Sequence, residues 1–108
     1  MINRDKVLSM VGLAMRAGKV TSGELSTEKA VKSHKAVLVL VAGDASENTK
    51  KLFKNMCAYY HVPFRIYGTK ADLGHAIGKE FRASLALLDQ GFAGTILKLV
   101  NPESEERR

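Results

Sequence analysis

The chain has few of the residues on which disulfide-stabilised, secreted or membrane-spanning proteins depend. Its only cysteine among 108 residues is Cys57, so no intrachain disulfide can form, as is usual in a reducing compartment. No apolar run approaches the roughly 18 residues of a membrane span. The N-terminus is charged and leads directly into an amphipathic pattern, unlike a secretory signal. We therefore expect a cytoplasmic protein without a membrane partner.

The sequence also has few groups that could perform catalysis. His34, His61 and His75 have no metal-ligand spacing, and Cys57 lies on the apolar face of a predicted helix, where thiols are usually inert. The glycines form neither a dinucleotide-binding fingerprint nor a phosphate-binding loop, and no pair of carboxylates suggests a general acid and base. We expect no metal, no cofactor and no enzymatic activity.

Positive charge is what the sequence has in excess. There are 17 Lys and Arg against 11 Asp and Glu, and the pI is near 9.6. Residues 1–35 hold seven basic and three acidic side chains, whereas residues 81–108 hold four of each. A small basic domain favours polyanions, chiefly nucleic acid. The alternative is a charged surface that serves solubility alone.

Helical and strand-like patterns alternate along one domain over residues 1–101, followed by a charged tail over 102–108. The apolar, Val-rich run Ala36–Ala42 is typical of a central strand covered on both faces. We predict α/β architecture, a three-layer α/β/α sandwich with a largely parallel or mixed four-stranded sheet. The predicted helices cover about 4–17, 23–34, a segment after Ser46, 70–78 and 90–100, and the predicted strands 19–21, 36–42, 64–67 and 84–89.

Helix starts supply further expectations. Asn3, Ser22 and Ser46 are expected as N-caps, and Thr69 with Asp72 resembles a capping box. Gly23 would then occupy a first helical position, where a missing Cβ lets an RNA backbone approach the unpaired amides. Leu25, Ser26 and Lys29 would share a helix face, and Lys32 would extend the basic surface. The alternative is an ordinary capped helix.

Several stretches together resemble a known family. They are Leu13–Gly23, Lys29–Val31, Val39–Ser46, Tyr59–Pro63 and Leu73–Lys79. In this order they resemble the L-seven-Ae / L-thirty family of ribosomal proteins, and within it the small bacterial, ribosomal-protein-like members. The resemblance covers nearly the whole chain. It implies a three-layer α/β/α fold, binding to structured RNA of the kink-turn type, and neither a cofactor nor catalysis.

The resemblance also implies which residues contact RNA. The family's contacts come from the start of the second helix and from the loop before the last strand. They fall here on Gly23, Glu24, Leu25, Ser26 and Lys29, and on Lys79, Glu80, Phe81, Arg82 and Ala83. The expected partners are structured RNA, ribosomal RNA first, and the ribosome itself; no DNA is expected.

The chain differs from typical kink-turn binders at one position in this pattern. Those proteins carry a polar pair that reads guanine edges, where this chain has Leu25-Ser26. Leucine can neither donate nor accept a hydrogen bond, and Glu24 places a negative charge near the expected phosphates. The alternative function is therefore a protein-interaction module that kept the fold and lost RNA binding, with Leu25 as a partner contact.

Overall fold

The computed structural model describes residues 5–100, which form five helices and four strands. The helices are α1 (Lys6–Arg16), α2 (Glu24–Lys32), α3 (Glu47–Tyr60), α4 (Lys70–Ala76) and α5 (Gln90–Leu99). The strands are β1 (Val20–Ser22), β2 (Leu38–Val41), β3 (Phe64–Ile66) and β4 (Ser84–Leu87). The order of elements is the predicted one, with bounds that differ by a few residues. The predicted tail over 102–108 lies outside the described residues, so the domain bounds stay a prediction.

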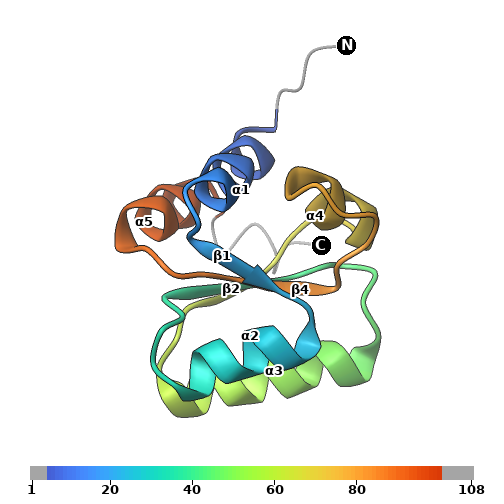
Figure 1. Ribbon diagram of the computed structural model, residues 1–108. Coiled ribbons are helices and arrows are strands. Elements are labelled where there is room, and N and C mark those ends of the chain that lie inside the picture. The colour runs from blue at the N-terminus through green and yellow to red at the C-terminus, as the bar shows by residue number, and fades with distance from the viewer. Residues whose placement is uncertain (1–4, 101–108) are drawn as a thin grey trace.

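The elements form three layers, which confirms the predicted α/β/α sandwich. Figure 1 shows α1, α4 and α5 on one face of the sheet and α2 and α3 on the other. The strand order is β1-β4-β2-β3. β4 runs antiparallel to both β1 and β2, and only the β2–β3 pair of the described strands is parallel. Of the two predicted sheet types, the structure has the mixed one.

The core is built on the two inner strands. All four residues of β2 and all four of β4 are buried, as the continuous apolar run over 36–42 predicted for β2. Each helix adds a short apolar face, as in α3, where Phe53, Met56 and Cys57 are buried. Two polar side chains are also buried, and their hydroxyls lie 3.4 Å apart: Ser84 donates to Thr27 across the β4–α2 contact. No described helix has the length and apolar composition to cross a membrane.

Two of the predicted helix caps are as expected, and one is wrong. Ser46 caps α3, and Thr69 forms the full capping box with Asp72. Ser22 is not an N-cap, because it is the last residue of β1; Gly23 is the N-cap of α2 and offers no side-chain bond. Asn3 lies outside the described residues.

The N-cap of α1 is Asp5. Its carboxylate accepts a hydrogen bond from the Leu8 amide at 2.9 Å and another from the Tyr67 hydroxyl at 2.7 Å. Burial, and then the bond to Asp5, raise the pKa of Tyr67 well above its usual range. Asp5 thereby joins the start of α1 to the end of the parallel strand pair.

Candidate RNA interface

Two segments far apart in sequence meet at one edge of the sheet, where β1 passes into α2 and α4 leads into β4. The Arg82 Nε donates to the Ser22 Oγ at 2.9 Å, and the Gly23 amide donates to the Ser84 carbonyl at 3.0 Å. Figure 1 shows both connections on the same side of the molecule. We call the surface formed by residues 22–26, 29 and 79–83 the junction surface. It unites the two sets of contact residues that the resemblance implied; Lys32, which was expected to extend the basic surface, lies outside it.

The turn into α2 depends on a conformation that favours glycine. Gly23 has φ 93° and ψ 158°, a region that side-chain-bearing residues rarely adopt. The site that a Cβ would occupy at Gly23 is open space. The structure thus gives Gly23 a reason beyond the predicted close approach of RNA: its backbone turns the chain from β1 into α2.

Arg82 is held from several sides. Besides its bond to Ser22, its guanidinium donates to the Phe81 carbonyl at 2.8 Å, and its backbone amide donates to the Lys70 carbonyl at 3.0 Å. The Lys70 amide in turn donates to the Asp44 carboxylate at 2.8 Å. Arg82 is only half-buried, so a fixed guanidinium remains accessible at the junction surface.

Close packing of α4 fixes the loop before β4. An ideal Cβ on Gly74 would lie 2.7 Å from the Glu80 carbonyl oxygen and 2.8 Å from the Phe81 Cα. Real Cβ atoms do not approach other atoms so closely, so only glycine lets the 80–81 backbone lie against α4. The position of the loop that carries Phe81 and Arg82 therefore depends on Gly74.

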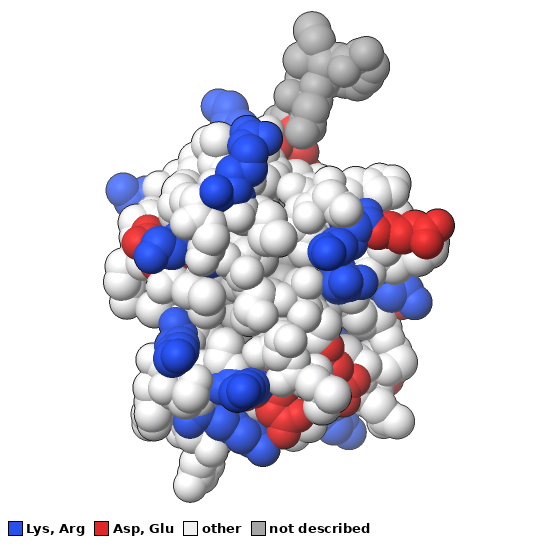
Figure 2. All heavy atoms as spheres, viewed as in Figure 1, with Lys and Arg blue, Asp and Glu red and all other residues white. Residues whose placement is uncertain are grey.

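The junction surface combines exposed apolar groups with both signs of charge. Leu25 is 81% exposed and Phe81 58%, the first and third most exposed of the large hydrophobic side chains. Lys29 and Lys79 are exposed, and so are the acidic Glu24 and Glu80. Figure 2 shows the same mixture, with lysine and arginine atoms beside acidic ones at the edge where α4 leads into β4. Such a surface can contact phosphate, sugar and the flat face of a base.

Two predicted residues contribute differently from the rest. Lys32 lies in the last turn of α2, away from the junction, and pairs with Glu28 at 2.7 Å. A hydrogen bond and the charge of Glu28 raise the pKa of Lys32. Ala83 is half-buried, and its carbonyl accepts a bond from the Ala42 amide at 2.8 Å, so it orders the loop through its backbone.

Groups suited to catalysis are not gathered here. Cys57 is buried, and burial raises the pKa of its thiol to about 11, so it is a thiol and not a thiolate at neutral pH. His34 and His61 follow the ends of α2 and α3, and His75 lies in the last turn of α4. Within residues 5–100 no three His, Cys, Asp or Glu side chains are grouped as metal ligands would be.

The fold and the junction surface define a class of protein. The chain belongs to the ribosomal protein L7Ae/L30e/S12e/Gadd45 family, whose model matches residues 5–96, so the resemblance seen in the sequence is confirmed. Among its relatives, it is 45% identical over 92 residues to the RNA-binding protein YlxQ of Bacillus subtilis, covering 85% of this chain and 92% of that protein. It is 43% identical over 98 residues to the YlxQ of Enterococcus faecium, covering 91% and 94%.

Relatives from eukaryotes and solved structures agree with this membership. The large ribosomal subunit protein eL30 of Neurospora crassa is 40% identical over 87 residues, covering 75% of this chain and 76% of that protein. A Bacillus halodurans protein of unknown function has a structure similar to this one, with a TM-score of 0.84 and 37% identity over 87% of this chain and 95% of that chain. The 15.5kD RNA-binding protein of Giardia lamblia shares the fold, with a TM-score of 0.77 at 21% identity over 98% and 92%.

Sequence reasoning missed three residues that build the junction. They are Ser22, which accepts the bond from Arg82, Gly74, which lets the loop pack, and Asp44, which fixes the start of α4. A glycine inside the predicted helix over 70–78 was the one available signal, because such glycines often mark close packing. The contacts of Ser22 and Asp44 join residues 60 and 26 positions apart, and no local pattern indicates them.

Proposed function

We propose that this protein binds structured RNA through the junction surface, with a kink-turn or a similar bent ribosomal RNA element as its ligand. The observation that carries the proposal is the union of residues 22–26 and 79–83 by the Arg82–Ser22 and Gly23–Ser84 hydrogen bonds. The family membership and the relatives named as RNA-binding support it. The ribosome is the assembly in which we expect that RNA, and the cytoplasm is the expected compartment.

The proposed mechanism is positioning rather than chemistry. Lys29, Lys79 and Arg82 neutralise phosphates, while the open backbone at Gly23 admits the RNA strand to the start of α2. Phe81 offers an aromatic face to a base displaced from its stack. Leu25 contacts sugar or base through van der Waals forces alone, so base readout there is weak.

The test is a titration of the protein against a kink-turn RNA and a straight duplex of equal length. We expect the kink-turn to bind at least tenfold more tightly, because a bent RNA can touch both segments of the junction surface at once. Equal affinities would show that the protein attracts polyanions in general and does not recognise bent RNA. Failure to bind either RNA would favour the alternative, a protein-interaction module, for which the exposed Leu25 and Phe81 offer an apolar contact.

Added salt should lower the affinity for RNA, and the steepness of that fall reports how many phosphates the protein contacts. Three cations of the junction surface, Lys29, Lys79 and Arg82, are exposed or half-buried. Each neutralised phosphate contributes about −0.7 to −0.9 to the slope of log affinity against log salt, so we expect a slope of about −2 to −3. Kink-turn affinity measured between low and physiological salt gives the slope. A slope near zero would mean that these cations do not contact phosphates.

Replacing Leu25 by asparagine should strengthen kink-turn binding about tenfold, or about 1.4 kcal/mol. The amide supplies the donor and acceptor that leucine lacks, and a bidentate base contact is worth about 1–3 kcal/mol in the analogous DNA case. Because Leu25 is 81% exposed, it does not pack into the core, and the melting temperature should change little. Titration of the unmodified protein and of the Leu25→Asn variant against the kink-turn and the duplex measures this gain. A gain for both RNAs alike, or for neither, would show that position 25 does not read a base.

A further inference from the structure

Three aromatic rings meet where α2 and α3 end, at the opposite end of α2 from the junction surface. The Tyr59 and Tyr60 ring centroids lie 4.9 Å apart at 76°, and His34 packs against Tyr60 at 5.8 Å and 68°. Tyr60 is half-buried against the core, whereas Tyr59 is 77% exposed. His34 has φ 63°, a left-handed conformation that ends the turn after α2. The cluster therefore holds one large aromatic ring in solvent beside two supporting rings.

A groove lies along α2 and ends at the turn that carries His34. It encloses about 320 Å³ between α2 and the edge strand β1, and its lining residues are Thr21, Ser26, Lys29, Ala30, Ser33, Lys35 and Leu88. The lining includes two lysines and three hydroxyl side chains but no acidic residue. Lys29 also belongs to the junction surface, and Lys35 directly follows His34 in the chain. The groove thus runs from the junction surface to Ser33 and Lys35, the two chain neighbours of His34 in the aromatic cluster.

We propose that this groove binds a short single strand of RNA, with phosphates at Lys29 and Lys35 and a base stacked on Tyr59. Single-strand sites combine a basic groove that follows the backbone with aromatic rings on which bases stack, and this end of α2 offers both. The hydroxyls of Thr21, Ser26 and Ser33 suit the 2′-hydroxyls of RNA. The binding needs no bent RNA, so it goes beyond the proposed function.

The site can be tested with an unstructured octanucleotide of alternating C and A, as RNA and as DNA. Fluorescence anisotropy of the labelled RNA at about 50 mM salt gives the affinity. The chain has no tryptophan and three tyrosines, so tyrosine emission reports stacking directly. We expect the RNA to bind and to quench this emission. Tyr59→Ala and Lys35→Glu should each weaken binding about tenfold, and Tyr59→Ala should also remove most of the quenching.

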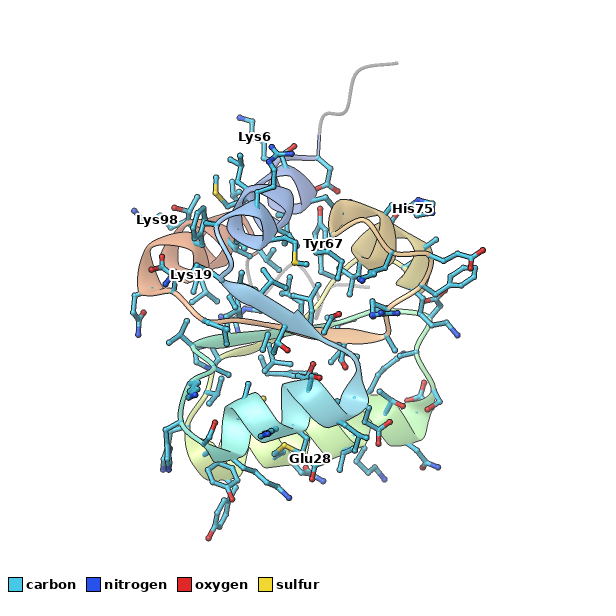
Figure 3. The ribbon with its side chains drawn as sticks, in the orientation of Figure 1. Lys6, Lys19, Glu28, Tyr67, His75 and Lys98 are labelled. Atoms are coloured by element: carbon cyan, nitrogen blue, oxygen red, sulfur yellow. The ribbon has the colours of Figure 1, made fainter. Side chains whose placement is uncertain are left out.

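Matched variants separate this site from general charge and from the junction surface. Leu52→Ala removes another exposed side chain from α3, and Lys98→Glu makes the same charge change on α5, on the other side of the sheet (Figure 3). Both should bind the octanucleotide as the unmodified protein does, whereas Arg82→Glu, which alters the junction surface, should lower kink-turn affinity more than octanucleotide affinity. Unchanged circular dichroism and melting temperature establish that each variant folds.

Three results would overturn the proposal. One is no binding of the octanucleotide by the unmodified protein. The second is an equal loss in Lys98→Glu or Arg82→Glu, which would place the strand elsewhere. The third is equal affinity for the DNA, which would remove the assignment to RNA. Loss of kink-turn binding with retained octanucleotide binding would instead contradict only the proposed function.

Discussion

Replacing Arg82 by glutamate should lower the affinity for kink-turn RNA about hundredfold, or about 2.7 kcal/mol. Hydrogen bonds to charged groups contribute about 1.5–3 kcal/mol each, and the new carboxylate would also repel phosphate. The side chain is pre-positioned, because its Nε already donates to Ser22 and its Nη1 to the Phe81 carbonyl. Little rotamer entropy is then lost on binding. Gel shift or calorimetry at fixed salt measures the effect.

The matched control is Arg16→Glu, the same charge reversal at an exposed position in the last turn of α1. This variant should lower the affinity for kink-turn RNA less than threefold, because Arg16 lies outside the junction surface. Ser22→Ala removes only the acceptor of the Arg82 bond, so it should weaken binding severalfold and lose its effect once Arg82 is replaced. If Arg16→Glu and Arg82→Glu weaken RNA binding equally, the RNA responds to the net charge of the protein and Arg82 has no specific role.

Much of the fold could be predicted because its signals are local. The run over 36–42 is too apolar for an edge strand, and β2 is indeed inner and buried on both faces. Ser46, Thr69 and Asp72 satisfy helix amides within three residues of themselves, so their spacing was enough to predict them. The alternation of helices and strands then allowed few architectures other than three layers.

The strand order was not predictable in the same way. β4 lies between β1 and β2, and it runs antiparallel to both. Alternating helices and strands favour parallel neighbours, but a strand runs antiparallel when the connection before it does not return the chain to the end of the sheet where the preceding strand began. Here α2 and α3 lie on one face, and α1, α4 and α5 on the other (Figure 1). That division is set by packing between distant segments, which periodicity does not report.

The candidate site was predictable as two segments but not as one surface. Gly23 was singled out because a residue without a Cβ at a helix start lets an RNA backbone approach the unpaired amides, yet that reason was incomplete. The adjacent Ser22 is a residue type that often caps helices, but its pairing with Leu85 keeps it in β1. Its hydroxyl is then available to Arg82 instead of to the helix amides. Tertiary pairing thus overrode a local preference at the position where the two segments meet.

Substitutions at two helical glycines can distinguish the effect of packing at the site from the effect of helix propensity. Gly74 in α4 and Gly94 in α5 are both helical, and only Gly74 has backbone within reach of an added Cβ. Alanine favours a helix interior over glycine by about 1 kcal/mol. Gly94→Ala should therefore raise the free energy of unfolding by about 0.5–1 kcal/mol and leave RNA affinity unchanged.

Gly74→Ala should instead lower both the free energy of unfolding and the RNA affinity. Its Cβ would lie 2.7 Å from the Glu80 carbonyl oxygen, so the 80–81 backbone must move away from α4. Overpacking of this kind costs about 1–3 kcal/mol, which exceeds the gain in helix propensity, and we expect a net loss of about 1–2 kcal/mol. The shift also displaces Phe81 and Arg82, so kink-turn affinity should fall about thirtyfold, or about 2 kcal/mol. Denaturant unfolding and RNA titration at a temperature where both variants are folded measure the two effects. A destabilised Gly74→Ala variant that still binds RNA normally would show that the loop before β4 is not part of the interface.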